Sequence, residues 1–104
     1  MIKVLKMKKL KEGKKKYEII FEKDGRKYVR KFGAAGMSDY TKHKDKDRKK
    51  LYIKRHQKRE NWTKSGLKTA GFWSRWILWN KPSLTASIKD VEKRFRVKIK
   101  KMIF

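Results

Sequence analysis

Lysine and arginine side chains between residues 42 and 64 carry the chemistry that this sequence suggests most directly. From Lys46 to Arg59 they occupy most of a predicted helix circumference. Each cation can neutralise a phosphate of a nucleic acid and release its condensed counterions. The alternative is a solvated face whose lysines contact only water. The predicted nucleic-acid-binding residues are Lys42, Lys44, Lys46, Arg48, Lys49, Lys50, Lys54, Arg55, Lys58, Arg59, Lys64, Lys89, Lys93 and Arg94.

A second set of side chains has the chemistry of divalent-metal ligands, which a metal-dependent nuclease would require. Its members are Asp39, His43, Asp45, Asp47 and His56. Asp45 and Asp47 also suit the first turn of a helix, and His56 falls on the predicted buried face of that helix. We therefore predict no metal site and no cofactor, and keep a nuclease as an alternative function.

Other catalytic patterns are absent from the sequence. The chain has no cysteine, which excludes a thiolate nucleophile and a disulfide framework. It also has no serine in a nucleophile elbow, no phosphate-binding P-loop and no dinucleotide-binding glycine pattern. The sequence predicts a protein that is not an enzyme.

The charge balance is the strongest indication of a partner. The 104 residues include 34 lysines and arginines against 10 acids, a net charge of +24 spread along the whole chain. A folded domain with this charge repels itself, and a polyanion relieves the repulsion. Lysine exceeds arginine, which suits neutralisation of phosphates more than recognition of guanine. We predict binding to nucleic acid, with duplex DNA favoured and no membrane partner. A ribosome-associated or other RNA-binding protein is the alternative.

The segment from Ala70 to Trp79 is the densest apolar stretch, with three of the four tryptophans. Its pattern predicts a buried helix over residues 69–79. Ten residues are too few to cross a bilayer. The alternative is an exposed platform on which unpaired bases stack. So many clustered rings also predict a homodimer that covers part of them.

The elements that must position these residues give an α+β fold in a single domain, residues 1–104. Lys23-Asp24-Gly25 separates two alternating segments, 17–22 and 26–32, which predicts an antiparallel hairpin, or a three-stranded meander if residues 1–10 join it. Helices are expected at about 45–60, 69–79 and 83–95, with Asp45 and Ser83 as N-caps. The alternation after residue 96 predicts a strand that returns to the sheet.

Seven short strings in the sequence carry a resemblance to known proteins. The strings are Lys31-Phe32-Gly33, Met37-Ser38-Asp39-Tyr40, His43-Lys44-Asp45, Arg55-His56, Asn61-Trp62, Thr69-Ala70-Gly71-Phe72-Trp73 and Leu78-Trp79-Asn80-Lys81-Pro82. They resemble a family of small basic proteins of nucleocytoplasmic large DNA viruses, the mimivirus and marseillevirus relatives, whose function is unknown. The resemblance covers about residues 17–90 and implies a viral protein that accompanies the genome in the particle, hence a location in the virion and in the host cytoplasm or nucleus. No signal peptide is expected, so the protein should not be secreted.

Overall fold

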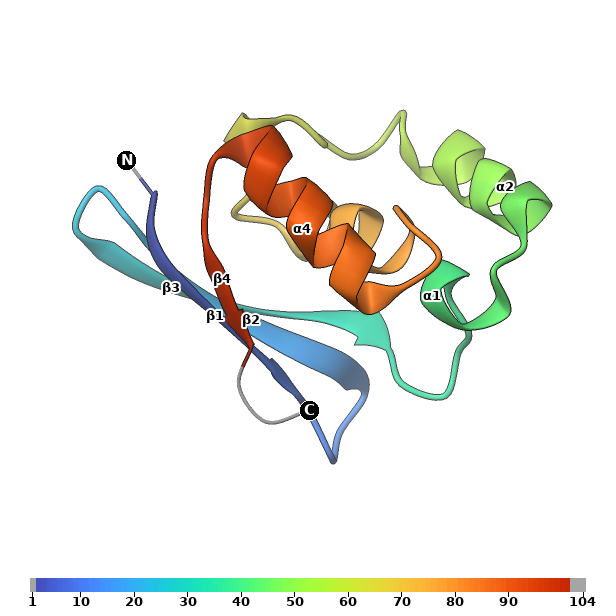
Figure 1. Cartoon of the computed structure of the whole chain (residues 1–104), viewed down its shortest axis with the longest axis horizontal. Coiled ribbons are helices and arrows are strands. Elements are labelled where there is room, and N and C mark those ends of the chain that lie inside the picture. Colours follow the sequence, from blue (N-terminus) through green and yellow to red (C-terminus); the bar gives the residue numbers. More distant parts are fainter. Residues whose placement is uncertain (1, 102–104) are drawn as a thin grey trace.

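A four-stranded mixed sheet forms one layer of the structure, and helices cover one of its faces (Figure 1). The computed structural model describes residues 2–101. Three antiparallel strands, β1 (Ile2–Lys9), β2 (Lys15–Lys23) and β3 (Arg26–Ala34), form the predicted meander. The last strand, β4 (Ile99–Lys101), pairs in parallel with β1, giving the order β3-β2-β1-β4. The predicted α+β fold and the returning strand are confirmed; residues 102–104 of that prediction lie outside the described residues.

The hairpin between β2 and β3 forms where the sequence predicts it. Asp24 and Gly25 have φ angles of 52° and 80°, and Lys23 pairs with Arg26 across the turn. Two successive positive φ angles match the right-handed twist of the strands, and glycine adopts them without strain. Alternation then places Ile19 and Phe21 on the buried face, as expected.

Arg30 is an exception to the predicted pattern of β3. We expected Arg30 to be solvated together with Lys31, but Arg30 pairs with Ile19 and so lies on the helix-covered face. Its Nε donates a hydrogen bond to the carbonyl of Lys68, and its guanidinium lies 5.6 Å from the Tyr28 ring centre. Period-2 alternation puts Arg30 on this face, and its long side chain reaches a carbonyl there.

Within the described residues, four α-helices follow the meander: α1 (Tyr40–His43), α2 (Lys46–His56), α3 (Ala70–Trp73) and α4 (Leu84–Phe95). A 3₁₀ turn, Lys64–Gly66, precedes α3, and a π-helical turn, Ser74–Leu78, continues it. The predicted helices at 69–79 and 83–95 are therefore confirmed. The first predicted helix ends at His56 and not near residue 60, while the short α1 was not predicted.

Side-chain caps explain where the helices begin. Asp45 accepts hydrogen bonds from the backbone N–H groups of Asp47 and Arg48, and Ser83 accepts one from Ala86. Both caps agree with the sequence prediction. Asp39 caps α1 in the same way by accepting from Thr41.

The core lies between the sheet and the segment from α3 to the π-helical turn. Phe72, Trp73, Ile77 and Leu78 are at most 2% exposed and pack with the inward side chains of the strands and of α4. Trp76 and Trp79 are only partly buried. Since one chain covers most of the aromatic run, this run no longer argues for a second copy, and the homodimer stays a prediction.

Helix α2 stands at the end of the molecule, away from the sheet (Figure 1). None of its side chains is fully buried. We expected Leu51 on its inward side, but Leu51 is 49% exposed. The inward side chains are instead Lys49, Tyr52, Ile53 and His56, which are intermediate in exposure. Their spacing of three, one and three residues defines the inward stripe and leaves Leu51 outside it.

Candidate nucleic-acid interface

Helix α2 and the turn that follows it present a row of lysines to solvent. Lys46, Lys50 and Lys54 lie on α2 and Lys58 lies on the turn, all exposed and at intervals of four residues. Within a helix this interval keeps side chains on one face at about 6 Å per step. We call these four residues the lysine row. Their ammonium groups can contact successive phosphates without any base being read.

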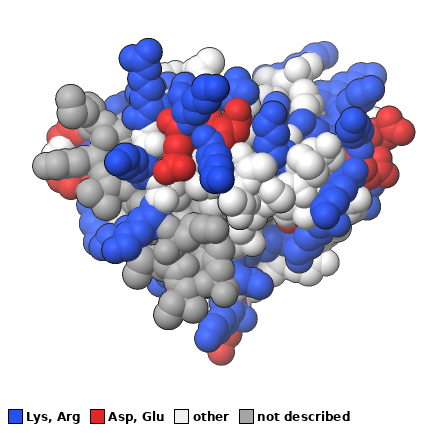
Figure 2. Space-filling model, viewed as in Figure 1, with Lys and Arg blue, Asp and Glu red and all other residues white. Residues whose placement is uncertain are grey.

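The predicted binding residues do not form one continuous surface. Lys89, Lys93 and Arg94 belong to α4, whereas most of the others surround α1 and α2 (Figure 1). Figure 2 shows lysine and arginine side chains scattered over the face in view, with a few acidic ones and uncharged surface between them. The predicted residues that are exposed are Lys42, Lys44, Lys46, Arg48, Lys50, Lys54, Arg55, Lys58, Arg59, Lys64, Lys89, Lys93 and Arg94.

Lys49 differs from the other predicted residues because its side chain points inward. Its Nζ donates a hydrogen bond to the Asn80 carbonyl at 2.6 Å and lies 4.9 Å from the centre of the Tyr40 ring. Burial, and then the nearby Arg75 and Lys81, lower the pKa of the Lys49 ammonium. Lys49 therefore anchors α2 to the loop before α4, which is a structural role.

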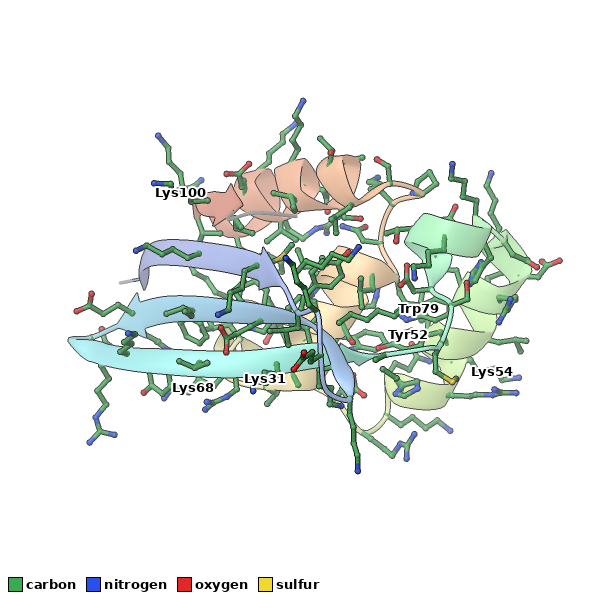
Figure 3. All side chains as sticks on the ribbon, turned by 90° about the horizontal axis from the view of Figure 1, so that it is seen from below. Lys31, Tyr52, Lys54, Lys68, Trp79 and Lys100 are labelled. Atoms are coloured by element: carbon green, nitrogen blue, oxygen red, sulfur yellow. The ribbon has the colours of Figure 1, made fainter. Side chains whose placement is uncertain are left out.

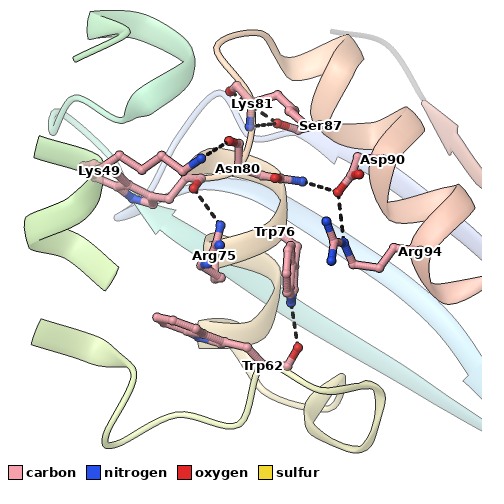
Figure 4. A network of polar contacts seen from close by, with 10 residues as sticks. Lys49, Trp62, Arg75, Trp76, Asn80, Lys81, Ser87, Asp90 and Arg94 are labelled. Atoms are coloured by element: carbon pink, nitrogen blue, oxygen red, sulfur yellow. Dashed lines mark hydrogen bonds and ion pairs between the residues drawn. The ribbon is translucent and has the colours of Figure 1, made fainter. Parts of the chain in front are cut away.

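Asn80 connects this anchor to α4 (Figure 4). Its side-chain amide donates to Asp90 Oδ2 at 2.7 Å, and Arg94 Nε donates to the same oxygen at 3.2 Å. Burial raises the pKa of Asp90, but these two hydrogen bonds and the nearby cations outweigh it, and the net pKa lies below the ordinary value. Arg94 remains exposed beyond this ion pair.

Arg75 is a positively charged residue that the sequence prediction missed. Its guanidinium lies 4.4 Å from the Trp76 ring centre and 5.3 Å from that of Trp62, and its Nη1 donates to the Trp79 carbonyl (Figure 4). Arg94 lies 4.5 Å from the centre of the Trp76 ring as well. Stacking on indole rings stabilises a guanidinium at a place where few carboxylates are available. No local sequence signal reveals this contact with Trp62, thirteen residues earlier.

Few cations are neutralised within the protein. In the described part of the chain, none of the lysine row forms an ion pair. The outer face of the sheet carries exposed lysines as well, namely Lys6, Lys27, Lys31 and Lys100. On that face Glu18 and Glu22 lie opposite lysines of the neighbouring strands, so acids interrupt the positive charge. Between residues 2 and 101, the ion pairs that engage lysine or arginine are Lys8–Glu18, Lys16–Asp39 and Arg94–Asp90.

Four of the five candidate metal ligands, all except Asp47, have other partners. Asp39 accepts from Lys16, and Asp45 caps α2. His43 Nδ1 accepts the backbone N–H of Asp45, and His56 Nδ1 lies 2.8 Å from Glu60 Oε2. Among residues 2–101, no three His, Cys, Asp or Glu side chains come together as a metal site would require. Within the same residues, no helix is long and apolar enough to cross a membrane.

The Asp90 carboxylate provides a pH-dependent prediction. Since its pKa is lower in the folded protein, its contribution to stability is present above the unfolded pKa of about 3.9 and is lost as pH falls through the folded value. Asp90→Asn should lower the free energy of unfolding by about 1–2 kcal/mol at pH 7 and by much less at pH 3. Urea denaturation at both pH values measures this, with Glu12→Gln as an exposed control. An equal loss of unfolding free energy for Asp90→Asn at both pH values would contradict a lowered pKa for Asp90 in the folded protein.

The comparisons with known proteins place the chain in a family. Residues 5–56, half of the chain, match a family model described as a family of unknown function, DUF5754. The match spans β1 to α2 and so includes most of the sheet and the lysine row up to Lys54. No curated protein and no solved structure matches the chain. This protein belongs to the DUF5754 family of unknown function.

Proposed function

We propose that this protein binds nucleic acid without catalysis and largely without regard to sequence, with duplex DNA as the favoured ligand. The observation that carries the proposal is the lysine row, whose four exposed ammonium groups have no carboxylate partner in the described part of the chain. With +24 charges on 104 residues, binding a polyanion removes self-repulsion that the fold itself leaves uncompensated.

The types of the exposed cations favour weak sequence specificity. Lysine ammonium groups contact phosphates as point charges, whereas base recognition in the major groove relies mostly on the planar guanidinium. Arg30 and Arg75 are engaged in contacts within the protein. Among the exposed predicted binding residues, nine are lysines and four are arginines, so this set as a whole suits the neutralisation of a backbone more than the reading of bases.

The resemblance to proteins of large DNA viruses suggests where such binding would be used. A protein that coats or condenses a viral genome needs many phosphate contacts and little sequence preference. We include in the proposal a location in the virion and in the host cytoplasm or nucleus. An RNA-binding role, as in a ribosome-associated protein, is the second candidate because unpaired lysines serve either polyanion.

The test compares affinity for duplexes of several sequences over a salt series. For the wild type we expect a steep linear fall of log affinity with log salt that hardly varies with sequence. Replacing the lysine row by glutamine, in a Lys46→Gln, Lys50→Gln, Lys54→Gln, Lys58→Gln variant, should flatten the slope by about 3–4, at about 0.9 per phosphate contact. Glutamine keeps helix propensity close to that of lysine.

A matched control separates the lysine row from net charge. A Lys6→Gln, Lys27→Gln, Lys31→Gln, Lys100→Gln variant removes the same charge from the outer face of the sheet and should change the slope by less than about 1. Equal slopes for the wild type and the lysine-row variant would refute this interface. Tighter binding to structured RNA than to duplex DNA would favour the second candidate, and magnesium-dependent cleavage of a plasmid would indicate a nuclease.

A further inference from the structure

A cavity of about 390 Å³ lies where the end of β3, the loop after it, α2 and α3 meet. Tyr52, His56 and Trp79 line it on one side, and Met37, on the loop, lines it on another. Figure 3 shows Tyr52 and Trp79 between the end of β3 and α2, with Lys54 nearby on the α2 side. The size and the mostly apolar lining are those of a site for a small aromatic group.

The aromatic wall of the cavity is held rigidly. The Tyr52 ring stacks on Trp79 with centroids 4.4 Å apart and an interplanar angle of 4°, and on His56 at 4.3 Å and 21°. Burial, followed by the nearby Glu60, raises the pKa of Tyr52. A neutral, fixed aromatic wall can contact the face or edge of a planar ring with little loss of entropy.

Polar groups capable of hydrogen bonding to such a ring line the same cavity. Glu60 accepts from Trp62 Nε1 at 2.8 Å, and its other oxygen lies 2.8 Å from His56 Nδ1. Gly71 leaves room for this carboxylate, because a Cβ there would lie 2.6 Å from Glu60 Oε1. With Nδ1 engaged by Glu60, His56 Nε2 has no hydrogen-bond partner among the described residues, so it can bond to a ligand.

The positive charge near the cavity lies mainly outside its lining. Lys15 and Lys16 line the cavity, but Asp39 and Glu60 line it as well, and Lys16 is paired with Asp39. The cations left for an anionic part of a ligand are therefore Lys15 and the lysine row on the exposed side of α2. The occupant must combine a planar aromatic ring with a neighbouring negative charge, a combination that each nucleotide of a nucleic acid provides. Bases in a duplex are stacked and paired, so only an unpaired base can enter such a cavity.

We infer that this cavity binds one unpaired nucleobase of a single-stranded nucleic acid while the lysine row contacts the adjoining phosphates. This inference rests on the proposed function and adds a site for an unpaired base to the phosphate contacts proposed there. Met37, which is 64% exposed, lines the cavity from the loop, and its flexible thioether can pack on a bound ring.

The test uses two strands of ten nucleotides, oligothymidylate and an abasic strand of the same length and charge. Wild-type protein should bind the thymidylate strand at least about fivefold more tightly, because base–aromatic stacking adds about 5- to 150-fold. Ala34→Trp and Ser38→Trp each add an indole at an exposed residue that lines the cavity and should abolish most of this preference. Ala35→Trp, exposed but outside the lining, should retain it.

The outcomes separate this inference from the proposed function. Equal binding of the two strands by the wild type would overturn the base site, as would an unchanged preference in both blocked variants with native circular dichroism. Binding of adenosine monophosphate more tightly than the strand would assign the cavity to a free nucleotide and also overturn it. In each of these cases a steep salt dependence on duplex DNA would leave the proposed function intact, and a flat one would refute that function.

Discussion

Replacing Trp73 by alanine is expected to lower the free energy of unfolding by about 3–5 kcal/mol. Trp73 is 2% exposed, contacts the rings of Phe21 and Phe72, and donates its Nε1–H to the Leu67 carbonyl at 2.7 Å. The substitution removes this packing, leaves a cavity and deprives the Leu67 carbonyl of its hydrogen-bond donor. Because domains of this size are stable by only about 5–15 kcal/mol, the loss is a large share of the total.

Urea denaturation followed by far-ultraviolet circular dichroism measures the effect of Trp73→Ala. The control is Leu51→Ala, which removes an apolar side chain that is 49% exposed and should change stability by less than about 0.5 kcal/mol. If the two variants were equally stable, the core described here would be wrong. A lower free energy of unfolding for Leu51→Ala but not for Trp73→Ala would show that Leu51 lies on the buried side of α2.

Replacing Asp39 by alanine should have a comparable effect through electrostatics. The side chains of Asp39 and Lys16 are 3% and 10% exposed, and Lys16 Nζ donates to Asp39 Oδ2 at 2.6 Å. Asp39 also accepts hydrogen bonds from the backbone N–H and the hydroxyl of Thr41 at the start of α1. Its removal leaves a nearly buried ammonium without a counter-charge, and we expect a loss of about 3–5 kcal/mol.

Two comparisons isolate the buried charge from the helix cap. Asp45→Ala removes an exposed N-cap that has no ion pair and should cost about 1 kcal/mol. The double variant Lys16→Met, Asp39→Ala removes both charges and should be more stable than Asp39→Ala alone. Chemical denaturation of the four proteins gives these differences. A double variant that is less stable than Asp39→Ala would show that Lys16 stabilises the fold without Asp39.

Local patterns in the sequence were sufficient for most of the elements. The Asp24-Gly25 turn favours one short hairpin geometry. The side chains of Asp45 and Ser83 accept hydrogen bonds from backbone N–H groups two to three residues later, so these signals act over short distances in the sequence. The same holds for the apolar spacing of α4, whose Ile88 and Val91 are buried. The predicted α+β fold depended on such short-range signals.

Tertiary contacts decided which side chains remain available for binding. The sequence alone determined the charge and the order of the elements, since these depend on composition and on short-range patterns along the chain. The sequence could not predict the contacts of Lys49 with Asn80, of Arg75 with Trp62, or of Tyr52 with Trp79. The two residues of each contact lie between 13 and 31 positions apart in the sequence. The packing of α2 and of the loop after it against the π-helical turn and the two residues that follow it brings these groups together, and the cavity beside Tyr52 lies at this junction.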